Sequence, residues 1–308
     1  MRFSVWLVAF LGAPASLLAD FREFKSVPLD AELGGRIARA AEASLKDFPR
    51  LTADNLALSV IDLTKQDAPL RADYHGDAAF YPASVIKLFF MVAAYHELGL
   101  PLTPEIDRAL REMIQVSDND AAAFLLDILT DTCSGSELQG KALEDFLERR
   151  RKLNRYFASL GYDISAMLKP WSFGPFGRDL QAVGENKQNR NRATANSVAS
   201  LLLWIMRQRA VSPPASEAML ALLERPLNPP RPAENQVKEY LGESLPAASK
   251  LWSKAGDTSE VRHDAAYVEL PSGRKFIIVA FTRGAADDKT LLPGIGKRLL
   301  AELSEDGK

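Results

Sequence analysis

Ser84 and Lys87 are the residues of this sequence whose types and spacing most directly suggest chemistry. They lie in the segment 81–94, where Lys87 is the only charged residue. A spacing of three places both side chains on one face of a helix, one turn apart. A desolvated lysine is one known way to activate a hydroxyl nucleophile. Alternatively, the Lys87 ammonium extends to solvent from the end of a core helix.

Two later segments add polar groups that could meet this pair. The Ser-Asp-Asn tripeptide at 117–119 falls in a short break between two expected helices. Capping alone also explains it, with Ser117 as the N-cap and Asp120 three residues on. Lys254 and Gly256 come at the end of an expected strand, and an edge-strand lysine followed by a turn glycine is the simpler explanation there.

Hydrophobic periodicity predicts the elements that must position these residues. Helices are expected over 29–48, from the Ser84 segment to about Gly99, and over 105–116, 120–129, 137–160, 194–209, 216–224 and 289–303. Strands are expected over 56–63, 70–74, 249–254, 264–269 and 275–282. Residues 169–192 are rich in Gly, Pro, Asn and Gln and predict a long loop, which in a compact domain is usually functional.

The order of these elements predicts an α/β fold. An antiparallel sheet flanked by helices would be built from both ends of the chain, with an all-helical region inserted between them. We expect residues 20–78 and 248–308 to form the α/β region and residues 79–247 the helical region, with the active site between the two.

Composition narrows the class of protein. The 308 residues carry a net charge of -2 without a concentrated basic patch, which argues against a nucleic-acid partner. Cys133 is the only cysteine, so no internal disulfide is possible. The three histidines are too scattered to suggest a metal site, and we expect neither a metal nor a cofactor.

The N-terminus predicts an export signal over residues 1–19. Arg2 is followed by an uncharged, apolar run that ends in small residues, and cleavage after Ala15 or Ala19 is expected. An uncleaved membrane anchor is the alternative, but the run is short for a span. We therefore expect a periplasmic or secreted protein without a stable membrane span after cleavage.

The serine–lysine pair, the Ser-Asp-Asn tripeptide and the lysine–glycine pair occur in that order, and together they resemble class A β-lactamases and penicillin-binding proteins. The resemblance covers nearly the whole chain after the signal. It implies a β-lactamase-like fold of two regions. It also implies a serine hydrolase that opens cyclic amides, with a small-molecule β-lactam or peptide-like substrate.

The resemblance also implies a role for each site residue. Ser84 would be the nucleophile, Lys87 would take its proton, and Ser117 would pass a proton to the leaving nitrogen. Asn119 would bind the substrate amide and tether Lys87, and Lys254 would place positive charge near the substrate carboxylate and Ser117. Beside them, Gly256 would contact the substrate, and the backbone amides of Ser84 and Asp257 would form the oxyanion hole.

Two positions depart from the family pattern. Ala255 stands where the family carries Thr or Ser between Lys and Gly, so a hydroxyl that helps to hold a substrate carboxylate is missing. Thr258, Ser259 or Arg262 could compensate.

The second departure concerns the glutamate that activates the deacylating water in class A β-lactamases. In the matching segment, Glu185 and Asn189 keep the spacing of four, but Gln188 replaces a leucine. Glu185 is therefore the candidate deacylation base, and a solvated loop acid is the alternative.

Three functions remain open from the sequence. The first is a β-lactamase-like hydrolase. The second is a penicillin-binding peptidase or esterase that acylates but releases β-lactams slowly. The third is a non-catalytic binding protein of the same fold, against which the complete polar set argues.

Overall fold

The computed structural model describes residues 21–171, 174–228 and 236–304. The expected signal peptide at residues 1–19 lies outside this part of the chain. Among the described helices, none is both long and apolar enough to cross a membrane.

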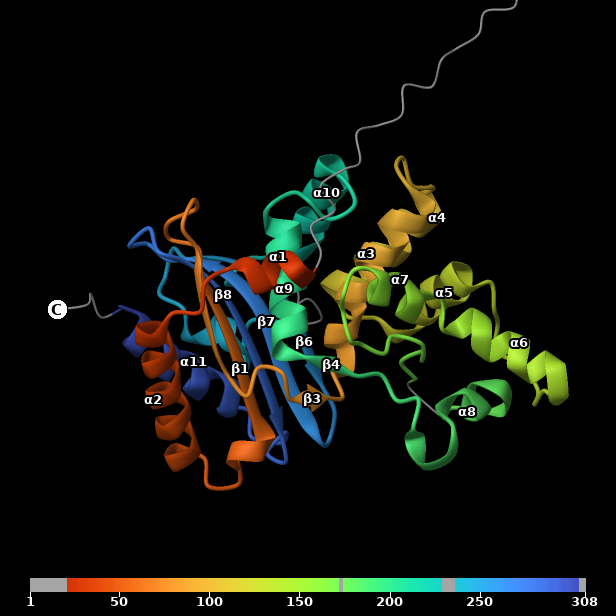
Figure 1. The fold of residues 1–308 in the computed structure, drawn as a ribbon, viewed down its shortest axis with the longest axis horizontal. Helices are drawn as coiled ribbons and strands as arrows, with labels where there is room; N and C mark the ends of the chain where they lie inside the picture. The colour runs from red at the N-terminus through yellow and green to blue at the C-terminus, as the bar shows by residue number, and fades with distance from the viewer. Residues whose placement is uncertain (1–20, 172–173, 229–235, 305–308) are drawn as a thin grey trace, which may run out of the picture.

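A six-stranded antiparallel sheet brings the two ends of the chain together, in the order β2-β1-β8-β7-β6-β5 (Figure 1). Its strands are β1 (Leu56–Asp62), β2 (Leu70–Tyr74), β5 (Glu224–Arg225), β6 (Lys250–Asp257), β7 (Val261–Glu269) and β8 (Lys275–Arg283). The early strand β1 pairs with the late strand β8, with Leu58 opposite Ala280. The α/β fold with an antiparallel sheet built from both ends is thus confirmed.

Helices cover both faces of the sheet (Figure 1). On one face lie α2 (Ala31–Asp47) and α11 (Leu291–Ser304), and on the other lie α9 (Ala195–Met206) and α1 (Phe21–Ser26). Along β8, Phe276 and Ile278 belong to the core under α2 and α11, whereas Ile277 and Val279 belong to the core under α9. Because successive side chains alternate between faces, both faces need apolar residues, and β8 is apolar almost throughout.

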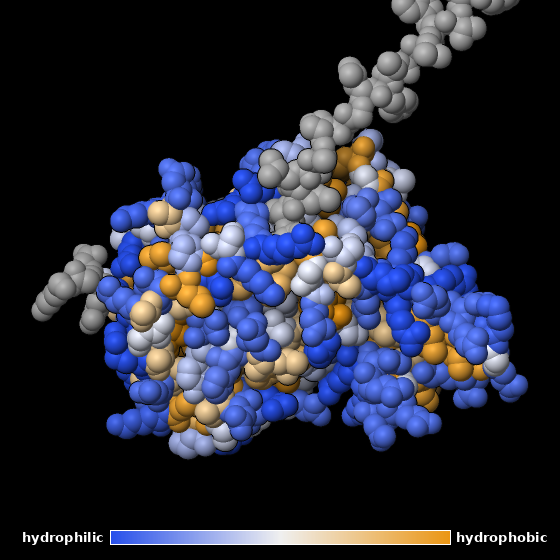
Figure 2. Space-filling view, viewed as in Figure 1, coloured by the Kyte–Doolittle hydropathy of each residue, from blue (hydrophilic) through white to orange (hydrophobic). Residues whose placement is uncertain are grey.

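The remaining helices pack beside the sheet and carry or support the site. They are α3 (Lys87–Leu98), α4 (Pro104–Gln115), α5 (Asn119–Thr130), α6 (Gly140–Arg150), α7 (Lys152–Ser159), α8 (Gly177–Val183) and α10 (Pro213–Leu223). Phe89, Leu110, Leu126 and Phe157 lie in their shared core. The face drawn in Figure 2 is mostly hydrophilic, with apolar residues in separate patches.

Among the helices beside the sheet, the structure differs from the expected elements at two places. The helix expected over 137–160 is two helices, α6 and α7, which meet at Arg151. The expected loop 169–192 contains α8, whose two buried residues are Asp179 and Ala182. A helix with a charged residue on its buried side shows no apolar periodicity, so the pattern did not reveal it.

The expected domain boundaries stay a prediction. Strand β5 comes from the range expected to be helical, and it forms the edge of the sheet beside β6, with Glu224 opposite Trp252. A second, two-stranded sheet of β3 (Ala79–Phe80) and β4 (Ala193–Thr194) joins the segment before Ser84 to the segment before α9.

Candidate active site

Ser84 lies in a short 3-10 turn, Ala83–Ile86, directly before α3. Ala83, the residue before it, has a φ of 45°, which is rare for a residue with a side chain. Val85 and Ile86 are buried, whereas Ser84 remains half-buried. The turn therefore directs its apolar residues inward and leaves the serine accessible, and strained backbone of this kind clusters at functional sites.

His263 on β7 holds the segment that leads into this turn. Its Nε2 lies 2.9 Å from the carbonyl oxygen of Tyr81, and its Nδ1 accepts from the amide of Thr282 at 3.0 Å. Because Nδ1 accepts, the proton is on Nε2, which donates to Tyr81, and the ring is neutral. Burial lowers the pKa of His263 to about 4, so the ring stays neutral at physiological pH. No local pattern around His263 predicts this bridge.

Lys87 is fully buried and paired. Its ammonium donates to the carbonyl oxygen of Ser117 at 2.6 Å and to Oδ1 of Asn119 at 2.8 Å, and Ser117 Oγ lies at 3.3 Å. Burial lowers its pKa to about 8, and the nearby Asp118 carboxylate opposes that shift. The side chain thus does not extend to solvent, and a large fraction of Lys87 is a free amine at weakly alkaline pH.

Asp118, not Ser117, caps α5. The Asp118 carboxylate accepts from the amide of Ala121 at 2.6 Å. Ser117 precedes the cap and has a φ of 61°, in the left-handed region. The alternative of a capping box with Ser117 as N-cap is therefore wrong, and the Ser117 hydroxyl is left to contact the two lysines of the site.

Lys254 on β6 reaches Ser117 from the sheet side. It is fully buried and donates to Ser117 Oγ at 3.0 Å. Burial lowers the pKa of Lys254 well below its usual value, and the charges of Lys87 and Arg225 lower it further. Ser117 Oγ therefore accepts from two ammonium groups and can donate its own proton elsewhere.

Gly256 lets β6 approach the turn that carries Ser84. A Cβ at this position would lie 2.8 Å from the backbone nitrogens of both Ser84 and Val85. Only glycine fits this contact without a shift of backbone. The strand also continues beyond its expected end at residue 254, as far as Asp257.

The register of β6 on β7 sets the direction of the Asp257 amide. Thr258 donates to the carbonyl oxygen of Val261, and Asp257 is the next residue in the ladder, opposite Arg262. Since bonded and non-bonded pairs alternate in an antiparallel ladder, the Asp257 amide points away from β7. The Ala255 amide points the same way and donates to Gln236 Oε1 at 3.0 Å. This orientation suits the oxyanion hole expected from the sequence, which stays a prediction.

Glu185 is not part of the hydrogen-bond network of Lys87, Ser117 and Lys254. It is exposed in the short turn Glu185–Lys187, and in the described part of the chain no hydrogen bond or ion pair joins its carboxylate to Ser84 or Lys87. Another residue of the same loop does reach the segment that leads into the Ser84 turn. The Arg190 guanidinium lies 3.8 Å from the centre of the Tyr81 ring and 3.4 Å from the Glu260 carboxylate.

The groups that could replace the hydroxyl missing at Ala255 are engaged elsewhere. Thr258 Oγ1 accepts from backbone amides of its own turn, where Ser259 is exposed. Arg262 is nearly buried and donates from Nε to the carbonyl oxygen of Ala286 at 2.9 Å. Neither Thr258 nor Arg262 contacts Lys254 or Ser84 within the described residues.

Gln236 is the site residue that sequence reasoning missed. Its side chain is buried, and Nε2 donates to the carbonyl oxygens of Ile114 and Gln115 at 2.9 and 2.8 Å. Its Oε1 accepts from Lys254 Nζ at 2.7 Å. It thus joins the end of α4, just before Ser117, to β6. A single glutamine outside any periodic segment gives no signal that could have revealed it.

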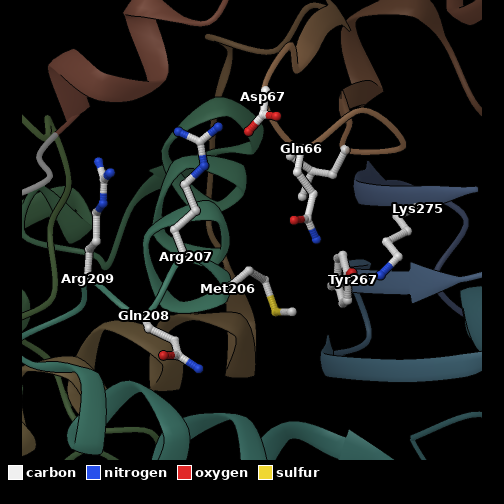
Figure 3. Close-up of a pocket in the computed structure, with 9 residues that line it drawn as sticks. Gln66, Asp67, Met206, Arg207, Gln208, Arg209, Tyr267 and Lys275 are labelled. Carbon is white, nitrogen blue, oxygen red and sulfur yellow. The ribbon is translucent and has the colours of Figure 1, made fainter.

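A separate hollow of about 480 Å³ lies between the end of α9 and strands β7 and β8 (Figure 3). Its cations already have partners: Arg207 and Arg209 pair with Glu23, and Lys275 pairs with Glu269. None of the motif residues lines it. In the described part of the chain, no cluster of three or more His, Cys, Asp or Glu side chains could hold a metal ion.

Comparison with known proteins identifies the family. A model described as the beta-lactamase enzyme family matches residues 97–303, which is more than half of the chain, and the chain belongs to this family. The matched range begins after Ser84 and Lys87 and includes the other two motifs. A search of curated protein sequences found no match.

Solved structures show the same fold at low identity. A mutant of PBP-A, solved as an acyl-enzyme complex with penicillin G, is 18% identical with a TM-score of 0.61, over 90% of this chain and 98% of that one. A representative class A beta-lactamase from Bacteroides cellulosilyticus is 18% identical with a TM-score of 0.61, over 90% and 100%. A beta-lactamase from Streptosporangium roseum is 18% identical with a TM-score of 0.63, over 88% and 99%.

Proposed function

We propose that the protein is a serine hydrolase that opens β-lactam amide bonds through an acyl-Ser84 intermediate. The observation that carries this proposal is the polar network beside Ser84. Ser117 Oγ lies within hydrogen-bonding distance of two buried lysines, at 3.3 Å from Lys87 and 3.0 Å from Lys254. Buried lysines are costly, and a non-catalytic protein of this fold has no need for two around one hydroxyl.

Acylation follows from this arrangement. The neutral Lys87 amine accepts the hydroxyl proton of Ser84 as its oxygen attacks the carbonyl carbon. The carbon–nitrogen bond then breaks, and Ser117 donates its proton to the leaving nitrogen and is reprotonated from the lysine pair. The amides of Ser84 and Asp257 would stabilise the oxyanion, a contribution of about 3 kcal/mol for each donor.

A slow-releasing penicillin-binding peptidase or esterase is the second candidate function. The exposure of Glu185 favours it, because within the described residues no hydrogen bond or ion pair joins the glutamate predicted to activate the deacylating water to Ser84 or Lys87. The likeness to PBP-A, which was solved with a penicillin G acyl group, supports acylation by a protein of this fold without deciding how fast the acyl group leaves.

Nitrocefin turnover by the purified protein tests the proposal and separates the two functions. We expect turnover by the wild type, none by Ser84→Ala, and in Glu185→Gln a fall of about 10²-fold or more, the typical contribution of a general base. Acylation of the Glu185→Gln variant should remain fast, so that the acyl-enzyme accumulates.

Glu144→Gln is the matched control, since Glu144 is an exposed acid on α6. Unchanged turnover in Glu185→Gln would remove Glu185 from the mechanism. A wild-type adduct that persists for hours, without turnover, would favour the slow-releasing function.

A further inference from the structure

The three protons of the Lys254 ammonium are all engaged within the protein. They are donated to Gln236 Oε1 at 2.7 Å, to the Ala255 carbonyl oxygen at 2.7 Å and to Ser117 Oγ at 3.0 Å. An ammonium group has three donors and no more, and this one is fully buried. No donor of Lys254 is left for a substrate.

Gln236 is held firmly in the position from which it occupies Lys254. Its Oε1 accepts from Lys254 Nζ and from the Ala255 amide, and its Nε2 donates to the carbonyl oxygens of Ile114 and Gln115. The side chain is buried, so water cannot replace these partners readily. A substrate group that displaced the Gln236 oxygen would break its two hydrogen bonds, to Lys254 and to the Ala255 amide, and leaving buried polar groups without partners is costly.

At the neighbouring positions of β6 and β7, the cation Arg262 is already engaged within the protein. Ala255 has no hydroxyl, and the residue opposite it on β7 is the buried acid Asp264, which accepts from the Leu241 amide at 3.0 Å. Asp257 is exposed and accepts from the Tyr240 hydroxyl at 2.7 Å. Arg262, opposite Asp257, is nearly buried and donates to Ala286. The surroundings of Lys254 therefore suit a neutral group better than an anionic one.

We propose that Ser84 reacts preferentially with acyl donors that are neutral beside the scissile amide, as esters or amides, and that Gln236 occupies the place on Lys254 that a substrate carboxylate takes in related enzymes. This inference deepens the proposed function and rests on Ser84 as the nucleophile. The chemistry is unchanged: the Ser84 oxygen–carbon bond forms, the carbon–nitrogen bond breaks, and the nitrogen takes a proton through Ser117. Lys254 then polarises Ser117 and does not clamp the substrate.

Benzylpenicillin and its methyl ester form a matched pair of probes, because they share the reactive ring and differ in one negative charge. The rate of Ser84 acylation by each is followed by intact mass measurement, in which the two adducts differ by one methylene. We expect the ester to acylate the wild type at least as fast as the acid. Faster acylation by the acid, by about tenfold or more, would overturn the inference and leave the proposed function standing. Reaction with neither compound would contradict both.

Gln236→Met tests the residue itself. Methionine has a similar volume and lacks the carboxamide, so a proton of Lys254 is freed for a carboxylate. A thermal unfolding curve first establishes that the variant is folded. We then expect the acylation rate with the acid, divided by the rate with the ester, to rise by about tenfold, the value of one hydrogen bond to a charged group. An unchanged ratio would contradict the assignment of Gln236, and if the variant does not fold, the wild-type ratio decides the inference.

Discussion

Lys87 and Lys254 lie on either side of one hydroxyl, that of Ser117, and neither is exposed. Two buried cations that interact disfavour each other's charged form, and the charge of Lys87 contributes to lowering the pKa of Lys254. The pair therefore releases protons at lower pH than an isolated lysine would. The protonation states of Lys87 and Lys254 are therefore coupled.

The lowered pKa of Lys87 predicts the pH dependence of acylation. Its pKa falls from 10.5 to about 8, so the free amine, and with it the acylation rate of Ser84, should rise with pH and level off above about 8. Lys87→Arg cannot lose its proton and should acylate about 10²- to 10⁴-fold more slowly. A stopped-flow pH–rate profile under single-turnover conditions measures both effects. A flat wild-type profile between about pH 6 and 9 would contradict a catalytic amine at Lys87.

Some residues of the site could be predicted from the sequence and others could not. Ser84, Lys87 and Ser117 stand out because their spacing and the apolar segment around Lys87 are unusual. Gln236 and His263 act through contacts with residues more than one hundred positions away, such as Gln236 with Ile114 and His263 with Tyr81. Only the folded chain brings these pairs together, so no local pattern marks them.

At the scale of elements, a buried ion cluster anchors the loop that carries Glu185 and Arg190. The Arg150 guanidinium on α6 lies 2.9 Å from the Asp127 carboxylate on α5 and 3.0 Å from the Asp179 carboxylate on α8. Lys169, at the start of the loop, also pairs with Asp127. The sequence pattern predicts an irregular loop over this segment. The buried ion pairs of Asp179 explain why helix α8 nevertheless forms there.

Asp179→Asn tests this anchoring. It leaves Arg150 buried with one charged partner fewer, and the loss of one partner of a buried pair typically costs about 3–5 kcal/mol. We expect the free energy of unfolding, measured in urea, to fall by about 3 kcal/mol.

Asp163→Asn is the matched control, because the Asp163 carboxylate is 83% exposed and pairs with Arg192 in the same loop. An exposed pair contributes less than about 1 kcal/mol. Equal losses in the two variants would show that the buried cluster has no special role.

The elements themselves divide into those with a regular apolar pattern and those without one. The strands β1 and β8 and the helices α4, α5 and α9 follow their patterns closely, because each has either one apolar face or a nearly continuous apolar run that the core buries. Helix α8 buries Asp179, and β5 is only two residues long, so neither has a pattern to find. Packing and ion pairing with other elements, and not local propensity, define these two.

At the scale of the whole molecule, the site exists only when the sheet and the helical part are assembled. Ser117 and Lys254, whose side chains meet at 3.0 Å, are 137 positions apart in the sequence. Gly256 allows β6 to lie against the Ser84 turn, and Gln236 joins β6 to the end of α4. The family fold therefore supplies the meeting point, where Ala255 departs from the family pattern and Gln236 accepts a hydrogen bond from Lys254.

The central claim is that Ser84 accepts an acyl group, and mass measurement of a trapped adduct tests it most directly. The protein is mixed briefly with excess benzylpenicillin or its methyl ester, quenched in acid, measured intact and then digested for peptide mapping. We predict one added acyl group per chain, located on Ser84 and missing in Ser84→Ala. No adduct and no turnover with either compound, or an adduct on another residue, would contradict the claim.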